Sequence, residues 1–207
     1  MGELIILRHG ETEWSRSGRH TGRTDVPLTP RGDEQARALA PPVARLSAVY
    51  AVTSPALRAR RTARLAGLID ADADAATETG TDTDLWEWDY GGYEGLTTPQ
   101  IRANRPGWYL WEDGVIPGDA NHPGETVEQV GDRVDAVLGR TRPRLAEGSV
   151  ILVAHGHVLR VLTARWLGLP PAAGRLFKLD TATISVLGTE HDRPVIRSWN
   201  VPANATA

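Results

Sequence analysis

Several residue types are missing or rare in this sequence, and each absence excludes a class of protein. Cysteine does not occur among the 207 residues, which excludes disulfide bonds, thiolate metal sites and a cysteine nucleophile. A chain that never relies on oxidation fits a reducing compartment, so we expect a cytoplasmic protein. No apolar run approaches the roughly 20 residues that a membrane-spanning helix needs, and the sequence predicts no membrane partner.

A basic surplus is also lacking. The formal net charge is -3 and hydrophobic residues make up 41%, so the chain has neither the charge of a nucleic-acid-binding domain nor the polarity of a disordered one. We therefore expect no nucleic-acid partner. Lys178 is the only lysine among 23 cationic side chains. Arginine is thus abundant throughout, and its abundance alone is no evidence for phosphate binding.

Three short apolar runs, at 4–7, 47–53 and 150–154, predict buried parallel strands. Each run is followed by polar residues and then by a segment with helical spacing. This alternation favours an α/β fold, a three-layer α/β/α sandwich with a mostly parallel sheet. Closing strands are expected at 184–187 and at 195–199, the latter at an edge.

Two helix starts carry capping signals. Thr29 precedes Pro30, and proline is favoured at the first helical position. Thr126 is followed three residues later by Gln129, as in a capping box. The helix from Thr126 carries valines and leucine at helical spacing, which we interpret as core packing rather than a cofactor site.

The segment 70–84 is rich in alanine, aspartate and threonine, and its Asp-x-Asp-x-Asp spacing matches the start of a calcium loop. The rest of that pattern fails, because the glycine position holds Ala75 and the closing glutamate is Thr81. We therefore predict a solvated acidic loop. No other cluster suggests a metal site.

Polar side chains follow the predicted strands at the points where they end. Arg8 and His9 come directly after the first strand, and Arg58 follows the second. His155 follows the third strand, and Glu87 lies in a segment between them. Because the carboxyl ends of parallel strands share one edge of a sheet, these side chains are expected to converge there. A lone histidine at a strand end is more often structural, but the four segments together favour an oxyanion site.

These motifs, in this order, resemble the histidine phosphatase superfamily, also called the phosphoglycerate mutase-like superfamily. The resemblance covers nearly the whole chain, through the motifs at 7–12, 21–29 and 54–59, the Glu87 segment, and His155-Gly156. It implies a single phosphoglycerate mutase-like domain over 1–201, with a lid segment at about 85–125 and a tail at 202–207. It also implies that no cofactor is needed.

The resemblance assigns roles to individual residues. His9 corresponds to the nucleophile that becomes phosphohistidine, and Glu87 to the general acid. Arg8, Arg58 and His155 correspond to the phosphate pocket. The resemblance also implies, by a less specific match of the motifs, that five further residues contact substrate or phosphate: Ser15, Thr21, Gly22, Tyr90 and Gly156.

These residue types suit phosphoryl transfer. An imidazole has a reference pKa of about 6.5, so neutral His9 is available to attack near neutral pH. Arginine is a permanently charged fork that binds two phosphoryl oxygens, and a protonated His155 would add a third cation. Such a set can replace the metal ions of other phosphatases. A carboxylic acid at Glu87 can protonate the leaving group and later deprotonate water.

Neighbouring residues compete for some of these roles. We favour Glu87 over the other nearby carboxylates, which are Asp89, Glu94, Glu11 and Glu13. His157 is expected either to contact the substrate or to make a structural hydrogen bond. His20 could reach the substrate from the loop before Thr21, but we favour a plain surface histidine. Some of the tryptophans near the motifs are expected to wall the pocket: Trp14, Trp86, Trp88, Trp108 and Trp111.

The segment between Glu87 and His155 separates phosphatases from mutases. Mutases of this family carry a longer segment there, with an adjacent arginine pair that binds the substrate's second charged end. This sequence has no such pair in the interval. We therefore predict a phosphomonoester hydrolase, with a phosphoglycerate mutase as the alternative.

The substrate is less defined by the sequence. The patterns around Glu87 and His155 look like those of broad-specificity acid phosphatases and of sugar bisphosphatases such as sedoheptulose bisphosphatase. The expected partner is thus a small phosphomonoester, a sugar phosphate or one of a broad range. A non-catalytic phospho-ligand-binding relative is an alternative of another class, but such a binder would not need Glu87. A homodimer is an open alternative.

Overall fold

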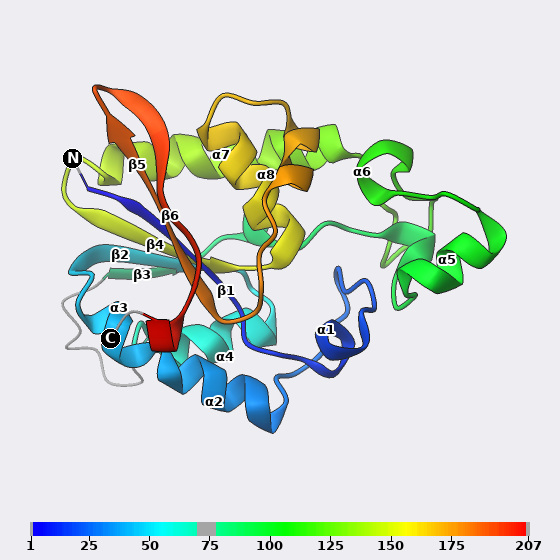
Figure 1. The fold of residues 1–207 in the computed structure, drawn as a ribbon, viewed down its shortest axis with the longest axis horizontal. Coiled ribbons are helices and arrows are strands. Elements are labelled where there is room, and N and C mark those ends of the chain that lie inside the picture. The colour runs from blue at the N-terminus through cyan, green and yellow to red at the C-terminus, as the bar shows by residue number, and fades with distance from the viewer. Residues whose placement is uncertain (1, 70–77, 206–207) are drawn as a thin grey trace.

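The computed structural model describes residues 2–69 and 78–205 (Figure 1). Within these residues six strands form one sheet in the order β3-β2-β4-β1-β5-β6. The strands are β1 (Leu4–Arg8), β2 (Ala48–Thr53), β3 (Glu78–Thr81), β4 (Ser149–Ala154), β5 (Thr183–Glu190) and β6 (Arg193–Pro202). The first four are parallel, whereas β5 is antiparallel to both β1 and β6. The predicted mostly parallel sheet is confirmed.

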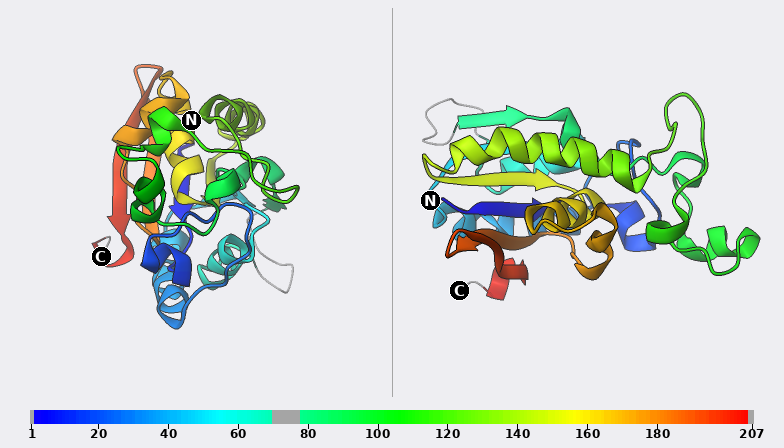
Figure 2. Two further views of the ribbon diagram at one scale, coloured as in Figure 1. Left: turned by 90° about the vertical axis from the view of Figure 1, so that its right-hand side faces the viewer. Right: turned by 90° about the horizontal axis from the view of Figure 1, so that it is seen from above.

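Helices cover both faces of the sheet (Figures 1 and 2). They are α1 (Glu13–Ser17), α2 (Pro30–Ala38), α3 (Ala40–Ala44), α4 (Leu57–Leu65), α5 (Thr98–Asn104), α6 (Leu110–Asp113), α7 (Val127–Arg144) and α8 (Gly156–Trp166). Short 3-10 helices are η1 (Thr83–Leu85), η2 (Gly91–Tyr93), η3 (Pro171–Leu176) and η4 (Ala203–Ala205). None of the helices in the described residues is long and apolar enough to cross a bilayer.

The central strands β1 and β4 are apolar at every position except Arg8 and Ser149, because they separate two apolar layers. In β1, Leu4 and Ile6 belong to the layer that contains the apolar side chains of α7 and α8. Ile5 and Leu7 belong to the opposite layer, with Leu39 at the end of α2 and residues of α3 and α4. Successive side chains of a strand point to opposite faces, so a strand covered on both sides reads as a continuous apolar run.

Both capped helix starts that the sequence predicts are confirmed. The Thr29 hydroxyl accepts a hydrogen bond from the Gly32 amide at 3.0 Å at the start of α2. At the start of α7 the Thr126 hydroxyl accepts from the Gln129 amide, and the Gln129 side chain accepts from the Thr126 amide. Each bond satisfies an amide that has no partner within the helix.

The predicted acidic loop is wrong over 78–84. These residues form β3, which pairs in parallel with β2, and then η1. The carboxylates of Asp82 and Asp84 lie against Arg140 of α7. Strand pairing is a tertiary contact that local composition does not encode, which is why a low-complexity stretch contains a strand. The calcium-like spacing at 70–74 lies outside the described residues.

The segment 85–125 contains α5 and α6, which lie beyond the end of the sheet where β1 and β4 finish (Figure 1). Hydrogen bonds between backbone groups connect this segment to the loop after α1. The His20 amide donates to the Leu96 carbonyl, and the Gly95 amide donates to the His20 carbonyl, both at 2.9 Å. The two chain segments therefore enclose the carboxyl edge of the sheet together.

Candidate active site

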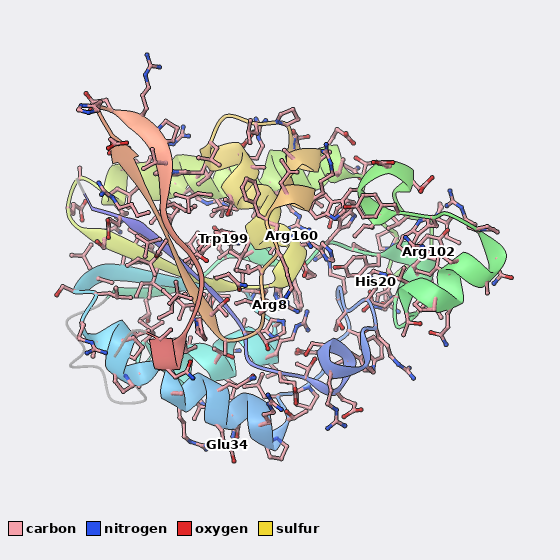
Figure 3. The ribbon with its side chains drawn as sticks, in the orientation of Figure 1. Arg8, His20, Glu34, Arg102, Arg160 and Trp199 are labelled. Atoms are coloured by element: carbon pink, nitrogen blue, oxygen red, sulfur yellow. The ribbon has the colours of Figure 1, made fainter. Side chains whose placement is uncertain are left out.

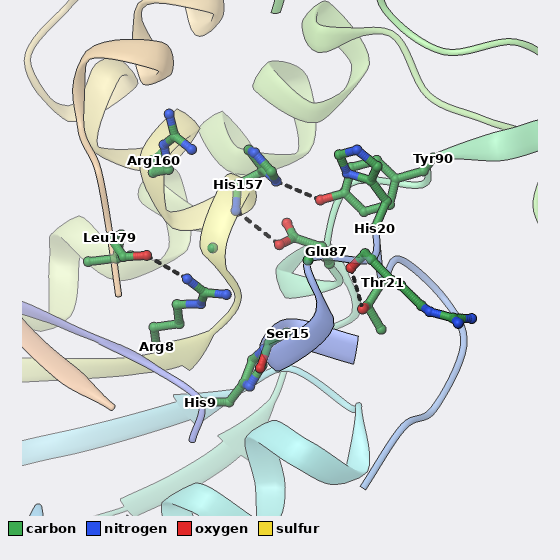
Figure 4. A pocket seen from close by; sticks show the side chains of 13 residues that line it. Arg8, His9, Ser15, His20, Thr21, Glu87, Tyr90, His157, Arg160 and Leu179 are labelled. Carbon is green, nitrogen blue, oxygen red and sulfur yellow. Dashed lines mark hydrogen bonds between the residues drawn. The ribbon is translucent and has the colours of Figure 1, made fainter. Parts of the chain in front are cut away.

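A cavity of about 190 Å³ lies beyond the carboxyl ends of β1 and β4 (Figure 4). Seven residues that the sequence predicted for the site line it: Arg8, His9, Ser15, Thr21, Glu87, Tyr90 and Gly156. Two further lining residues, His157 and His20, had a substrate contact as one of two sequence interpretations. Sequence reasoning did not place the remaining lining residues there: Gly18, Arg19, Arg160 and Leu179. The predicted residues Arg58, His155 and Gly22 do not line the cavity, and all three are buried.

His9 is held in one orientation and one tautomer. Its Nδ1 lies 2.7 Å from the Gly10 carbonyl oxygen, so Nδ1 carries a hydrogen that it donates there. The lone pair is then on Nε2. Burial lowers the pKa of His9 well below its ordinary value, and the charges of Arg58 and Arg8 lower it further. The ring is therefore neutral at pH 7, which a nucleophile requires.

Arg8 presents an unused donor beside this ring. Its Nη1 donates to the Leu179 carbonyl at 2.5 Å, whereas its buried Nε has no hydrogen-bond partner among the described residues. Gly156 leaves room for the guanidinium, because a Cβ there would lie 3.2 Å from the Arg8 Cζ. A buried donor without a partner is costly, and an oxyanion in the cavity would satisfy it.

Arg58 lies behind the cavity and is fully buried. Its Nε donates to His155 Nδ1 at 3.1 Å, and its Nη1 and Nη2 donate to the carbonyls of Thr24 and Gly22, both at 2.9 Å. Most of its N–H groups are thus bound by the protein. Its charge nevertheless acts on His9, since among the charged groups it is the largest contributor to the lowered pKa of His9.

His155 differs from the cationic role suggested by its motif. Its Nδ1 accepts from Arg58, so the hydrogen is on Nε2, which lies 2.7 Å from the Ser54 hydroxyl. Burial lowers the pKa of His155 well below its ordinary value, as do Arg58 and the neighbouring His9. A neutral ring follows, and the expected third cation is absent from this geometry. The ring instead lies 5.1 Å from the His9 ring and orients Arg58.

Glu87 is the acidic residue among those lining the cavity, and it is 5% exposed. Its carboxylate accepts from the backbone amides of His157 at 2.9 Å and Val158 at 2.8 Å, in the first turn of α8. It also accepts from the Trp88 amide at 3.0 Å. No side chain at the N-cap position does this for α8, so Glu87 satisfies amides that the helix leaves unpaired.

The rival carboxylates have other partners and do not line the cavity. Asp89 accepts from the Gly91 and Gly124 amides. Glu11 accepts from the Thr29 hydroxyl, and Glu13 pairs with Arg16 on the surface. Glu94 accepts from two backbone amides of the loop after α1. The geometry therefore favours Glu87 over each of them as the acid.

Two histidines lie on the side of the cavity that faces away from His9 (Figure 4). The Tyr90 hydroxyl and His157 Nδ1 are 2.6 Å apart and share a hydrogen bond, and burial raises the pKa of Tyr90 well above its ordinary value, so the hydroxyl keeps its proton. The expectation of a surface His20 is wrong. Its ring is 4.8 Å from Tyr90, its buried Nε2 has no partner among the described residues, and burial lowers its pKa to about 4.

Three predicted phosphate contacts are engaged within the protein. The Ser15 hydroxyl accepts from the Thr12 amide at 2.9 Å and donates to the Thr12 carbonyl at 3.0 Å. The Thr21 hydroxyl donates to the Arg19 carbonyl at 3.1 Å (Figure 4). The Gly22 amide donates to Glu94 and not into the cavity. Only Ser15 and Thr21 retain a position in the cavity wall.

A second cavity of about 170 Å³ adjoins the first and shares His20, His157 and Arg160 with it. Trp108 and Trp111 line this second cavity, and none of the five tryptophans near the motifs lines the first. The Arg160 guanidinium lies 4.7 Å from the centre of the Trp111 ring. Its position could have been inferred, because Arg160 follows Gly156 by four residues and so lies on the same helix face.

No group of three or more histidine, aspartate or glutamate side chains is placed to hold a metal ion in the part of the chain that the structure describes.

The geometry of a strand-end histidine beside an arginine and a helix-capping glutamate agrees with a family comparison. The family model for the histidine phosphatase superfamily (branch 1) matches residues 4–202. The chain belongs to this superfamily. A solved structure of an open reading frame product from Mycobacterium tuberculosis superimposes with a TM-score of 0.87, at 39% identity over 98% of both chains. The resemblance seen in the sequence and the fold it implied are confirmed.

Curated relatives include phosphatases and a mutase. An acid phosphatase of M. tuberculosis is 42% identical over 91% of this chain and 87% of its own length. Sedoheptulose 1,7-bisphosphatase of Saccharomyces cerevisiae is 38% identical over 80% of this chain and 67% of its own. A probable phosphoglycerate mutase of Salmonella choleraesuis is 32% identical over 97% and 91%. The chain is an enzyme of the histidine phosphatase type.

Proposed function

We propose that this histidine phosphatase hydrolyses small phosphomonoesters through a phosphohistidine at His9. The observation that carries the proposal is the juxtaposition in one cavity of a neutral His9, the unpartnered Nε of Arg8 and the carboxyl group of Glu87. These supply a nucleophile, a donor for phosphoryl oxygens and a proton-transfer group. Arg58 and His155 act from behind the cavity, through charge and orientation.

In the first step, the lone pair of His9 Nε2 forms a bond to phosphorus while the bond from phosphorus to the leaving oxygen breaks. Arg8 binds the phosphoryl oxygens, whose negative charge must be stabilised in the transition state. The Gly156 amide, at the N-terminus of α8 and in the cavity wall, adds a backbone donor. Protonated Glu87 transfers its proton to the leaving oxygen.

In the second step, a water oxygen bonds to phosphorus as the bond from phosphorus to Nε2 breaks. The electron pair returns to His9, and Glu87 takes the proton from water. Inorganic phosphate leaves, and both residues regain their starting protonation states. Glu87 Oε2 accepts a hydrogen bond from the His157 amide, while Oε1 accepts two, from Trp88 and Val158. Oε2 is therefore the oxygen with a free position for the proton.

The substrate class we propose is a sugar phosphate or a broader set of small phosphomonoesters. The second cavity offers aromatic walls, two neutral histidines and the Arg160 guanidinium, which suit a leaving group with both apolar faces and hydroxyls. The yeast relative is named for a sugar bisphosphate and the mycobacterial one as an acid phosphatase. A screen of kcat/KM across sugar phosphates, bisphosphates and aryl phosphates tests this choice.

A phosphoglycerate mutase is the second candidate, since one relative carries that name. Against it, the single arginines of the lid bind groups of the lid itself. Arg102 donates to the Trp108 carbonyl and Arg105 to the Tyr93 hydroxyl, and Arg102 lies well away from Arg8 (Figure 3). With 3-phosphoglycerate and a bisphosphoglycerate primer, we expect phosphate release to exceed isomerisation. Dominant isomerisation would favour the mutase.

The covalent intermediate is the decisive test. Rapid quenching with a labelled aryl phosphate should trap acid-labile, base-stable phosphate on His9, and turnover in the presence of EDTA should be unchanged. Hydrolysis without a trapped phosphoenzyme would exclude the phosphohistidine route. Loss of activity in EDTA that Mg²⁺ or Zn²⁺ restores would indicate a metal-assisted reaction instead. Tight binding of phosphate without turnover would favour the non-catalytic alternative.

A further inference from the structure

The carboxylate of Glu94 and the guanidinium of Arg58 form hydrogen bonds to opposite sides of the loop 21–25. On one side, the carboxylate of Glu94 accepts from the Gly22 amide at 2.9 Å and from the Thr24 amide at 3.2 Å. On the other side, Arg58 donates to the Thr24 and Gly22 carbonyls at 2.9 Å and to the Thr21 carbonyl at 3.4 Å. The loop backbone therefore connects a lid residue to a residue behind the nucleophile.

One peptide unit takes part in both contacts. The carbonyl of Thr21 and the amide of Gly22 belong to the same peptide bond, and in a trans peptide these groups point in opposite directions. A negative charge at the amide end and a positive charge at the carbonyl end polarise this unit in the same sense, which strengthens both hydrogen bonds. Moving the loop toward either partner weakens its bonds to the other.

The orientation of Arg58 depends on this loop more than on any direct ion pair. The nearest carboxylate in the described residues is Asp25, whose oxygen lies 4.0 Å from Nη1 and whose side chain is 38% exposed. Glu94, by contrast, is 9% exposed. His122 lies 4.0 Å from the Glu94 carboxylate and 3.2 Å from the Thr24 hydroxyl, on the lid side.

Gly22 explains why the contact is so close. A Cβ at this position would lie 2.8 Å from Glu94 Oε2 and 2.7 Å from the Trp88 carbonyl oxygen. No side chain larger than hydrogen fits without moving the carboxylate or the backbone. The close approach of Glu94 to the loop therefore requires a glycine at this position. Gly22 affects the phosphate pocket indirectly, by allowing this contact.

We propose that Glu94 is a positioning residue for the phosphoryl-transfer step, which holds Arg58 in place through the backbone of the loop 21–25. This inference rests on the proposed function. Arg58 stabilises phosphoryl charge and keeps His9 neutral, so a displaced Arg58 impairs both. Glu94 touches neither the cavity nor the reacting atoms, and its role is separate from the proton transfer by Glu87.

Glu94→Gln tests the proposal with little change of shape. The glutamine side chain keeps one acceptor oxygen, but its NH₂ donor faces the backbone N–H donors of the loop. The negative charge of the carboxylate is also lost. We expect kcat/KM to fall roughly ten- to a hundredfold, by the same factor for an aryl phosphate and an alkyl phosphate, and vanadate to bind more weakly. Glu112→Gln, the same change at an exposed site on α6, should leave these values unchanged.

A double-mutant cycle with Arg58→Gln separates positioning from general damage. If Glu94 acts through Arg58, adding Glu94→Gln to Arg58→Gln causes little further loss. Fully additive losses of kcat/KM in the double variant would overturn the proposal, and so would an unchanged kcat/KM in Glu94→Gln. A loss confined to alkyl phosphates would also overturn it, because it would make Glu94 a general acid.

A turnover-independent measurement keeps this test distinct from that of the proposed function. NMR titration of the His9 ring should give a higher pKa in Glu94→Gln than in the wild type, because Arg58 is displaced. An unchanged His9 titration in folded Glu94→Gln would reject the positioning role even if the wild type hydrolysed nothing. Glu94→Asp, which keeps the charge, serves if the glutamine variant does not fold, and its shorter side chain should produce an intermediate loss.

Discussion

Two opposite walls of the cavity hold their polar groups differently. At the strand ends, His9 and the side chains behind it are fixed by hydrogen bonds to backbone carbonyls and to one another, and Arg8 Nε is left to bind an oxyanion. On the opposite wall, His20 Nε2 is buried without a partner in the described residues, and His157 uses one ring nitrogen for Tyr90. The strand-end wall suits a group of constant shape, and the opposite wall leaves ring nitrogens for a variable one.

This difference separates two tasks. The phosphoryl group is common to every substrate, so residues that handle it can be fixed before binding, which lowers the reorganisation needed in the transition state. The leaving group differs among substrates, and polar groups without internal partners can adapt to it. Substitutions in the two walls should therefore give different kinetic patterns.

Removal of the nucleophile should have the largest effect. His9→Ala is expected to lower kcat by more than the roughly 10²–10³-fold that loss of one transition-state donor causes, because the other histidines that line the cavity, His20 and His157, lie on its side away from His9. Release of p-nitrophenol and trapping of acid-labile phosphate measure this loss. Retention of a phosphoenzyme in this variant would assign the nucleophile to another residue.

Glu87→Gln should distinguish the two tasks directly. Alkyl and sugar phosphates, whose alkoxides leave poorly, are expected to slow by roughly 10²–10⁴-fold. The burst of p-nitrophenol from an aryl phosphate should be largely spared, and the burst must be used because hydrolysis of the phosphoenzyme can become limiting. Arg58→Gln provides the contrast, since it should slow both substrates. Equal slowing of both by Glu87→Gln would argue against Glu87 as the acid.

The pH profile should identify the charges that act on His9. Attack requires the neutral ring, and an ordinary histidine loses that form below about pH 6.5. Because burial, Arg58 and Arg8 lower the pKa of His9, kcat/KM should persist at more acidic pH than that. Arg58→Gln removes a positive charge that opposes protonation, so the pKa rises and the acid limb moves to higher pH. The same substrate in both enzymes controls for its own ionisation.

Tyr90→Phe should have the smallest effect on the chemical step. It removes the hydroxyl that shares a hydrogen bond with His157 Nδ1 at 2.6 Å and leaves a buried ring nitrogen unpaired, which costs about 1–3 kcal/mol of stability. A lower melting temperature and a few-fold change in the ratio of kcat/KM between sugar and aryl phosphates are expected. If the rate changed for every substrate but the ratio of kcat/KM between sugar and aryl phosphates did not, Tyr90 would act on the phosphoryl group and not on the leaving group.

The sequence predicted the positions of the strand-end residues better than their contacts, for a physical reason. Arg8 and His9 follow an apolar run whose burial is visible in the sequence, so their place at the carboxyl edge follows from local pattern. The partners of Arg58 are backbone carbonyls, and the neutral state of His155 depends on burial next to Arg58. Contacts of that kind come from the tertiary arrangement and have no signature in residue type.

The same limit explains the misplacement of His20 and β3. His20 precedes the Thr21-Gly22 motif by one position, which hints at the site, but its burial depends on Tyr90 and Trp108 far along the chain. Strand β3 follows an alanine-, aspartate- and threonine-rich stretch and is specified by pairing with β2. In both cases a long-range contact decides what local composition leaves open.

The capping of α8 by Glu87 also bears on how the enzyme assembles. His157 and Val158 find their acceptor 70 and 71 residues earlier in the chain, so the first turn of the helix cannot be completed by neighbouring sequence. Closing a loop of that length has an entropic cost that is recovered only when the lid segment docks. Hydrogen exchange at these two amides therefore reports docking of the Glu87 carboxylate, and it should slow together with the recovery of activity during refolding.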